Sequence, residues 1–264
     1  MIKFCFCTIA FQNKKWGKDR QIEVPLLEIL PMIADAGYDG VEIWGPHVME
    51  MVPEQRETLA RRLQDLDLDV AMISPYFNFT TSEETAAESV REGLEVLSVA
   101  RRLNSRGIRC FTGKTASADA TEEQWQRTAR SVQQLADSTR PGRTIWAFET
   151  HSWNLMDTQE SSLELMRRID RSNVGLIFQP STFGEQYMEA LDNLAPHIRH
   201  VHATNKADGE RSLLGEGDMD YEQIVAGLRR IGFDGYISVE WMGDDPAGTA
   251  AREAEYLRDL LGRE

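Results

Sequence analysis

The feature that most constrains the fold is a regular alternation of short apolar segments with longer amphipathic segments along the whole chain. The short segments have the length and composition of strands, and each of the eight is followed by a segment of helical periodicity. We expect strands near residues 2–10, 40–44, 68–75, 108–112, 144–149, 174–178, 198–201 and 236–239. We expect helices near residues 23–36, 54–66, 83–105, 121–139, 158–171, 184–195, 220–231 and 246–262. Gly37 is typical of a helix C-cap, and Thr121 is typical of an N-cap.

Eight strands that each precede a helix, within 264 residues, predict a (β/α)8 barrel. A doubly wound sheet is the main rival, but it would need a glycine-rich phosphate loop after the first strand, and residues 10–15 contain no glycine. No linker, low-complexity tract or charge block divides the chain. We therefore expect one domain that spans residues 1–264.

The charge and the cysteine content exclude several classes of protein. The chain carries 29 basic and 43 acidic residues, a net charge of −14, which repels nucleic acid and anionic membranes. It has no apolar stretch of about 20 residues that would span a membrane, and its first residues do not match a secretory signal. Three cysteines, Cys5, Cys7 and Cys110, are too few for a disulfide framework. We expect them to be reduced core residues of a cytoplasmic protein.

Four consecutive strands late in the chain each end on a side chain with an oxygen or nitrogen donor. These residues are Glu149, Gln179, His202 and Glu240. Because successive side chains of a strand alternate between its two faces, each donor opposes the bulky apolar residues of its strand. The bulky set suits the layer between sheet and helices, so we expect the four donors to point into the barrel. They lie at the carboxyl ends of the strands, where barrel enzymes carry their chemistry.

Two carboxylates, an amide oxygen and an imidazole make a donor set for a hard or borderline divalent metal. We therefore predict a metal site at these four residues, with Mn²⁺ as the first choice and Mg²⁺, Co²⁺ or Zn²⁺ as alternatives. Each residue alone has a more ordinary explanation, such as a salt-bridged glutamate or a histidine satisfied in the core. The prediction depends on their joint position at one end of the barrel.

Several motifs, spread over essentially the whole chain, resemble the xylose isomerase-like TIM barrels, the sugar phosphate isomerase/epimerase group. They are residues 3–8 (KFCFCT), 37–44 (GYDGVEIW), 148–151 (FETH), 200–202 (HVH), 214–217 (LGEG) and 232–240 (GFDGYISVE). The resemblance implies a metal quartet, usually Glu, Asp, His and Glu, from strands 5 to 8. It also implies a homo-oligomer, a dimer or a tetramer.

Gln179 departs from that quartet, because the family has an aspartate at its position. With a neutral amide, the four ligands carry a summed charge of about −2 in place of −3, which should strengthen the metal as a Lewis acid and weaken its binding. The family also tends to carry a histidine where this chain has Thr182.

A divalent metal flanked by two carboxylates suits proton abstraction next to a carbonyl, through an enediolate. The resemblance implies that Glu149 and Glu240 act as acid and base while they ligate the metal. We therefore expect an isomerase or epimerase that acts on a sugar or ketose. The same site could instead remove a β-hydroxyl, as an inosose-type dehydratase, or expel a larger group, as a lyase that deglycosylates keto-glycosides.

Four further side chains are candidate substrate contacts. His151 follows Glu149 on the same face, and Trp44 and His47 follow the second strand. Arg211 follows the seventh strand and could bind an anionic group, although a solvated loop charge is its more ordinary explanation. The chain has no glycine nest for a phosphate, so we expect a neutral sugar, ketose, inositol derivative or oxidised glycoside.

Two other classes of protein remain as rivals. A nucleic-acid endonuclease would need a cluster of zinc ligands and a basic groove, and five histidines with a charge of −14 oppose it. A non-catalytic subunit would carry Gln179 as the mark of a decayed metal site.

Overall fold

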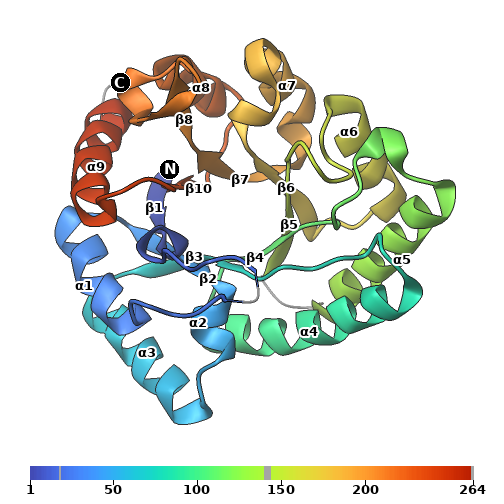
Figure 1. Cartoon of the computed structure of the whole chain (residues 1–264). Helices are drawn as coiled ribbons and strands as arrows, with labels where there is room; N and C mark the ends of the chain where they lie inside the picture. The colour runs from blue at the N-terminus through green and yellow to red at the C-terminus, as the bar shows by residue number, and fades with distance from the viewer. Residues whose placement is uncertain (18, 140–143, 263–264) are drawn as a thin grey trace. The chain divides into compact units, whose positions relative to one another are not determined.

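The computed structural model describes residues 1–17, 19–139 and 144–262 of the chain. Its eight parallel strands form one closed sheet in the order β1-β10-β7-β6-β5-β4-β3-β2 (Figure 1). The predicted (β/α)8 barrel is thereby confirmed. The strands are β1 Lys3–Cys7, β2 Gly40–Trp44, β3 Asp69–Ser74, β4 Gly107–Cys110, β5 Ile145–Glu149, β6 Val174–Phe178, β7 Ile198–Ala203 and β10 Tyr236–Val239.

Every predicted helix is present, with small differences at the ends. The helices are α1 Leu26–Ala36, α3 Pro53–Asp65, α4 Glu83–Arg102, α5 Glu122–Thr139, α6 Gln159–Ile169, α7 Tyr187–Leu194, α8 Tyr221–Arg230 and α9 Pro246–Gly262. Helix α1 begins later than predicted because Pro25, in an extended conformation, occupies its N-cap. Helix α4 ends earlier than predicted, since Gly107 already belongs to β4. The sequence did not predict the short helix α2 Gly45–Met49 or the hairpin of β8 Asn205–Ala207 and β9 Glu210–Ser212.

The chain divides into two compact halves: residues 1–73 with 201–264, and residues 74–200. A single domain over the whole chain stays a prediction. In the first half, β1 pairs with β2 and β10, and β10 pairs with β7. Gly37 ends α1 with a φ of 86°, as its predicted C-cap role requires. Gly40 opens β2 where a Cβ atom would collide with the carbonyl oxygen of Asp69, so β2 needs glycine at that point.

In the second half, β5 pairs with β4 and β6. Helices α4, α5 and α6 lie side by side along this half (Figure 1). Helix α5 shows why these segments are helical: Trp125, Ala129, Val132 and Ala136 recur at helical spacing and are all buried. Thr121 caps α5 by accepting a hydrogen bond from the Gln124 amide, as predicted.

Two expectations about the class of protein can be compared with the described residues. None of their helices is both long enough and apolar enough to cross a membrane. Cys5, Cys7 and Cys110 are free thiols, and all three are buried, which confirms that they are core residues.

Candidate functional site

Glu149, the last residue of β5, is buried together with the guanidinium of Arg109 from β4. Arg109 Nη1 donates a hydrogen bond to Glu149 Oε2 over 3.1 Å, and the two side chains are only 5% and 2% exposed. Arg109 Nη2 donates to the carbonyl oxygens of Ser74 and Pro75, at 3.2 Å each. A buried carboxylate is costly without a cation, so Arg109 explains how Glu149 stays inside the protein.

Aromatic rings gather after β3, β4 and β5, around the same guanidinium. We call Tyr76, Phe111, His151 and Trp153 the aromatic cluster. Arg109 lies 4.7 Å from the centre of the Tyr76 ring and 4.3 Å from that of Phe111, both cation–π distances. The Phe111 and Trp153 rings are 4.7 Å apart, and the His151 and Trp153 rings are 4.6 Å apart. The cluster offers flat, partly exposed apolar surface beside a buried ion pair.

Gln179 directly follows β6, the strand that pairs with β5. Its backbone amide donates to the Thr150 hydroxyl over 3.0 Å, which ties Gln179 to the residue after Glu149. Gln179 is 7% exposed, and its Oε1 atom has no hydrogen-bond partner among the residues that the structure describes. A buried amide oxygen without a partner is costly, so an added cation would satisfy it. Thr182, which replaces the family's histidine, donates its hydroxyl proton to the Thr150 carbonyl.

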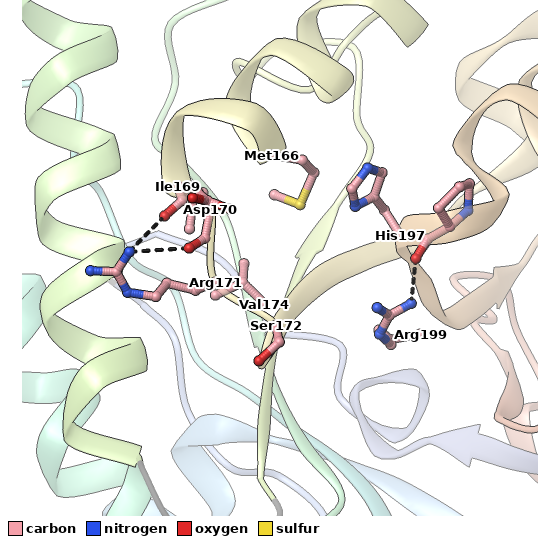
Figure 2. A pocket seen from close by; sticks show the side chains of 9 residues that line it. Met166, Ile169, Asp170, Arg171, Ser172, Val174, His197 and Arg199 are labelled. Atoms are coloured by element: carbon pink, nitrogen blue, oxygen red, sulfur yellow. Dashed lines mark hydrogen bonds between the residues drawn. The ribbon is translucent and has the colours of Figure 1, made fainter.

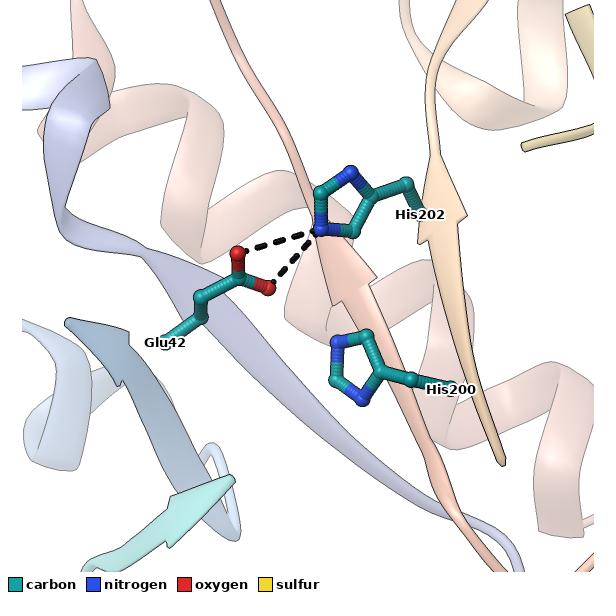
Figure 3. Close-up of side chains that lie close together, drawn as sticks. All are labelled: Glu42, His200 and His202. Atoms are coloured by element: carbon teal, nitrogen blue, oxygen red, sulfur yellow. Dashed lines mark hydrogen bonds and ion pairs between the residues drawn. The ribbon is translucent and has the colours of Figure 1, made fainter. Parts of the chain in front are cut away.

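In the first half, His202 of β7 lies between two glutamates. Its Nε2 atom is 3.1 and 3.0 Å from the two carboxylate oxygens of Glu42 on β2 (Figure 3). Its Nδ1 atom is 3.9 Å from Oε2 of Glu240, the residue after β10. Glu42 and His202 are each 1% exposed, whereas the Glu240 side chain is 18% exposed.

Two predicted substrate contacts, Trp44 and His47, are buried beside each other. Their rings are 5.5 Å apart in an edge-to-face arrangement, and each residue is 1% exposed. Burial lowers the pKa of His47 to about 4, so its imidazole is neutral near pH 7. A contact of either residue with substrate stays a prediction.

Lys15 and Arg211 are two cationic side chains of the first half that lie near each other. Burial and the charge of Arg211 lower the pKa of Lys15, while Glu240 opposes that shift. Arg211, on β9, donates from Nη1 to the Met242 carbonyl oxygen over 2.7 Å. The sequence had indicated Arg211 but gave no reason to choose Lys15, which follows η1 (Thr8–Phe11) in the first loop.

A separate cavity of about 280 Å³ lies in the second half, near the amino ends of β6 and β7 (Figure 2). Its lining residues are Met166, Ile169, Asp170, Arg171, Ser172, Val174, Pro196, His197 and Arg199. Arg171 donates there to the carbonyl oxygens of Ile169 and Asp170, and Arg199 donates to that of Pro196. This lining contains none of the predicted site residues, which lie at the opposite ends of their strands.

The structure therefore places the predicted donors in two groups. His202 and Glu240 are together in the first half, and Glu149 and Gln179 end paired strands in the second. The sequence did not predict Arg109 or Glu42 as site residues. Arg109 and Glu42 share an overlooked signal: each is a lone charged residue inside a buried strand, at an alternate position with glycine.

The chain is similar to known proteins over nearly all of its length. A family model described as xylose isomerase-like TIM barrel matches residues 30–260. A 3-dehydroshikimate dehydratase from Bacillus anthracis is 26% identical, over 97% of this chain and 96% of that protein. An inosose dehydratase from Clostridium perfringens is 23% identical, over 98% of this chain and 97% of that protein.

Solved structures share the fold. A probable 3-DHS dehydratase from Bacillus anthracis, involved in petrobactin synthesis, has a TM-score of 0.85 at 23% identity, over 97% of this chain and 98% of its own. An L-ribulose 3-epimerase has a TM-score of 0.81 at 19% identity, over 99% and 95% of the two chains. Two further structures with this fold were solved with a metal. The IOLI protein, with a bound zinc atom, has a TM-score of 0.78 at 20% identity, over 99% of this chain and 98% of its own. A xylose isomerase-like TIM barrel protein from Mycobacterium smegmatis, in complex with magnesium, has a TM-score of 0.79 at 16% identity, over 98% of this chain and 96% of its own.

Proposed function

Because this chain belongs to the xylose isomerase-like TIM barrel family, we propose that it is a divalent-metal-dependent dehydratase acting on a hydroxylated cyclic ketone that carries a carboxylate. The observation that carries this proposal is the buried Glu149 at the carboxyl end of β5, held by the buried cation Arg109. The full-length similarity to two dehydratases favours a lyase over the isomerase or epimerase that the motifs favoured.

The metal would be held by Glu149, Gln179, His202 and Glu240, with Mn²⁺ as our first choice. His202 and Glu240 supply an imidazole and a carboxylate in the first half, and Glu149 supplies a carboxylate at the end of β5 in the second. The partnerless, buried Oε1 of Gln179 is a suitable fourth ligand. When bound, the metal would polarise the ketone oxygen and stabilise negative charge that develops there.

The two glutamates would divide the proton transfers of an elimination. Glu149 removes a proton from the carbon next to the ketone, and the electron pair of that C–H bond forms a C=C bond. The C–O bond to the β-hydroxyl breaks as Glu240 supplies a proton, so that water leaves. Arg109 compensates the charge of Glu149 and keeps its carboxylate in place through the 3.1 Å hydrogen bond.

Two features of the site support a cyclic acid as the substrate. The aromatic cluster provides a flat wall that suits a six-membered ring better than an open-chain sugar. Lys15 and Arg211, which lie near each other, suit a substrate carboxylate. This departs from the neutral substrate that the sequence favoured, and it selects the 3-dehydroshikimate type of substrate over the inosose type.

The test is a comparison of two substrates with the Mn²⁺-loaded protein. Loss of water from 3-dehydroshikimate leaves an aromatic ring, so ultraviolet absorbance follows the reaction directly. We expect turnover of 3-dehydroshikimate, much slower turnover of inosose, and a loss in kcat of at least about 10²–10⁴-fold in Glu149→Gln. Glu253→Gln, which alters a buried glutamate of α9, is the matched control and should keep wild-type activity.

The possible outcomes test the dehydratase reaction and the carboxylate-bearing substrate separately. Dehydration of inosose alone would keep the lyase and reject the carboxylate-bearing substrate. Absence of dehydration of either compound, or full activity in Glu149→Gln, would reject the dehydratase.

An isomerase or epimerase is the second candidate, because proton abstraction by Glu149 is common to both reactions. Such an enzyme would return the proton to carbon and keep the hydroxyl. Incubating a panel of ketoses with the loaded protein in D₂O would identify it through deuterium in recovered sugar without loss of water. We also propose a cytoplasmic homo-oligomer, a dimer or tetramer, which light scattering of the purified protein would test.

A further inference from the structure

Glu42 is a buried carboxylate that none of the proposed catalytic steps uses. It lies in the middle of β2, whose five residues are all buried, and the Glu42 side chain is 1% exposed. Its two oxygens are 3.1 and 3.0 Å from one atom, Nε2 of His202 (Figure 3). A carboxylate that approaches one ring nitrogen with both oxygens must accept a proton from that nitrogen, because two acceptors facing each other would repel.

We propose that Glu42 is a positioning residue that fixes the proton of His202 on Nε2, so that Nδ1 is the nitrogen presented to the metal. A neutral imidazole carries one N–H, and the nitrogen that donates is set by its hydrogen-bond partner. With the proton on Nε2, the lone pair is on Nδ1, which is on the side of Glu240, 3.9 Å from its Oε2. The inference rests on the proposed function only in naming a metal as the ligand.

The arrangement of β7 and β2 supports an orienting role. Metal-bound histidines commonly donate their second N–H to a carboxylate, which fixes the ring orientation and increases its basicity as a ligand. The register of β1 places Cys7 beside Glu42, and the register of β10 places Ser238 beside His202. Both neighbours are buried, so the pair is enclosed within the sheet on these two sides.

A direct role of Glu42 as a metal ligand is the competing explanation. The Glu42 carboxylate and the Nε2 atom of His202 could instead both coordinate the ion, since they face each other at 3.1 and 3.0 Å. In that arrangement the metal would replace the proton on His202 Nε2, and Nε2 would be the coordinating nitrogen. Both explanations have the proton on Nε2 before metal binds, so they differ in which nitrogen of His202 coordinates the metal.

Histidine ¹⁵N spectroscopy distinguishes the two nitrogens without any variant of Glu42. The chain has five histidines, so His202→Asn identifies the His202 signals in the metal-free protein labelled with ¹⁵N-histidine. We expect the neutral ring to carry its proton on Nε2, and added Zn²⁺ to shift the Nδ1 signal as the coordinating nitrogen. A proton on Nδ1, or coordination of Zn²⁺ through Nε2, would overturn the proposal.

Metal affinity measures the consequence of the hydrogen bond. In calorimetric titrations with Mn²⁺ alone, Glu42→Gln should bind about 10–100-fold more weakly, the usual loss when such a partner of a ligand is removed. Glu42→Asp, which keeps a carboxylate, should recover part of that loss, and Glu253→Gln should bind as the wild type does. An unchanged Mn²⁺ affinity in Glu42→Gln, with an unchanged His202 tautomer, contradicts the inference.

Different results would contradict the proposed function and the orienting role of Glu42. A wild-type protein that binds no Mn²⁺ would reject the proposed function, while the metal-free spectrum would still decide the position of the His202 proton. If Glu42→Gln does not fold, the ¹⁵N spectrum of the wild type and the Mn²⁺ affinity of Glu42→Asp still test the inference.

Discussion

Glu149 in the second half and Glu42 in the first are both buried carboxylates inside the barrel strands, but their partners differ in kind. Glu149 faces Arg109, whose guanidinium remains charged at every pH at which proteins fold. Glu42 faces His202, whose neutral imidazole donates from one nitrogen and accepts at the other, so that it need not bring a positive charge to the pair. The first partner compensates charge, whereas the second fixes an orientation.

The surroundings of the two pairs agree with this difference. Arg109 is held by two carbonyl oxygens and by the rings of Tyr76 and Phe111, so its position does not depend on Glu149 alone. His202 is held between Glu42 and Glu240, and a change in either carboxylate alters the ring. Breaking the first pair should therefore affect mainly stability, and breaking the second should affect mainly metal binding.

The largest effect is expected for Arg109→Met, which leaves the Glu149 carboxylate buried without its cation. Removing one partner of a buried pair typically costs about 3–5 kcal/mol in the free energy of unfolding. Urea unfolding of the metal-free protein measures this change in the free energy of unfolding. The double variant with Glu149→Gln should be more stable than the sum of the single changes predicts, by about 1–3 kcal/mol. Strictly additive effects would mean that Arg109 does not compensate Glu149.

Glu253 extends the comparison to a third buried carboxylate, whose hydrogen-bond donor is a neutral backbone amide. It lies on α9, is 2% exposed, and accepts a hydrogen bond from the Leu214 amide over 2.9 Å. Burial raises its pKa to about 7 from 4.5. Because the folded state holds the proton more tightly, the stability that Glu253 contributes is present below pH 4.5 and is lost as the pH rises through about 7.

The second prediction follows from this loss of stability with rising pH. Glu253→Gln cannot titrate, so its stability relative to wild type should increase between pH 5 and pH 8, by about 2–3 kcal/mol. Urea unfolding at several pH values measures the difference. A constant difference across this range would show that the Glu253 carboxyl titrates in the folded protein as it does in water.

The fold was predictable from the sequence because strand and helix periodicities are local. The apolar run that stops at Glu149 and the amphipathic pattern of α5 are visible without knowledge of any partner. The donors at strand ends were found for the same reason. The short helix α2 and the β8–β9 hairpin were missed, since α2 is little more than one helical turn that begins with Gly-Pro, and the two strands of the hairpin have three mostly polar residues each.

The partners inside the barrel were not predictable, because they depend on register and on side-chain length. Arg109 is level with Ala147 in the β4–β5 register, and its long side chain reaches Glu149 two residues further along. Nothing in a four-residue strand indicates that reach. Glu42 and His202 are 160 positions apart in the sequence, and only the folded chain shows that they touch.

The smallest effect is expected at Gln179, where an aspartate would place a third carboxylate among the proposed ligands. Gln179→Asp should bind Mn²⁺ about tenfold more tightly, or about 1.4 kcal/mol, because it adds a full charge where the wild type offers an amide oxygen. Gln186→Asp, which makes the same change at an exposed position nearby, is the control in the same calorimetric titration. Equal gains in the two variants would reflect the added charge at a distance, whereas a gain at position 179 alone would identify a ligand. If neither variant binds more tightly, Gln179 is not a ligand of the metal, and the proposed site consists of Glu149, His202 and Glu240.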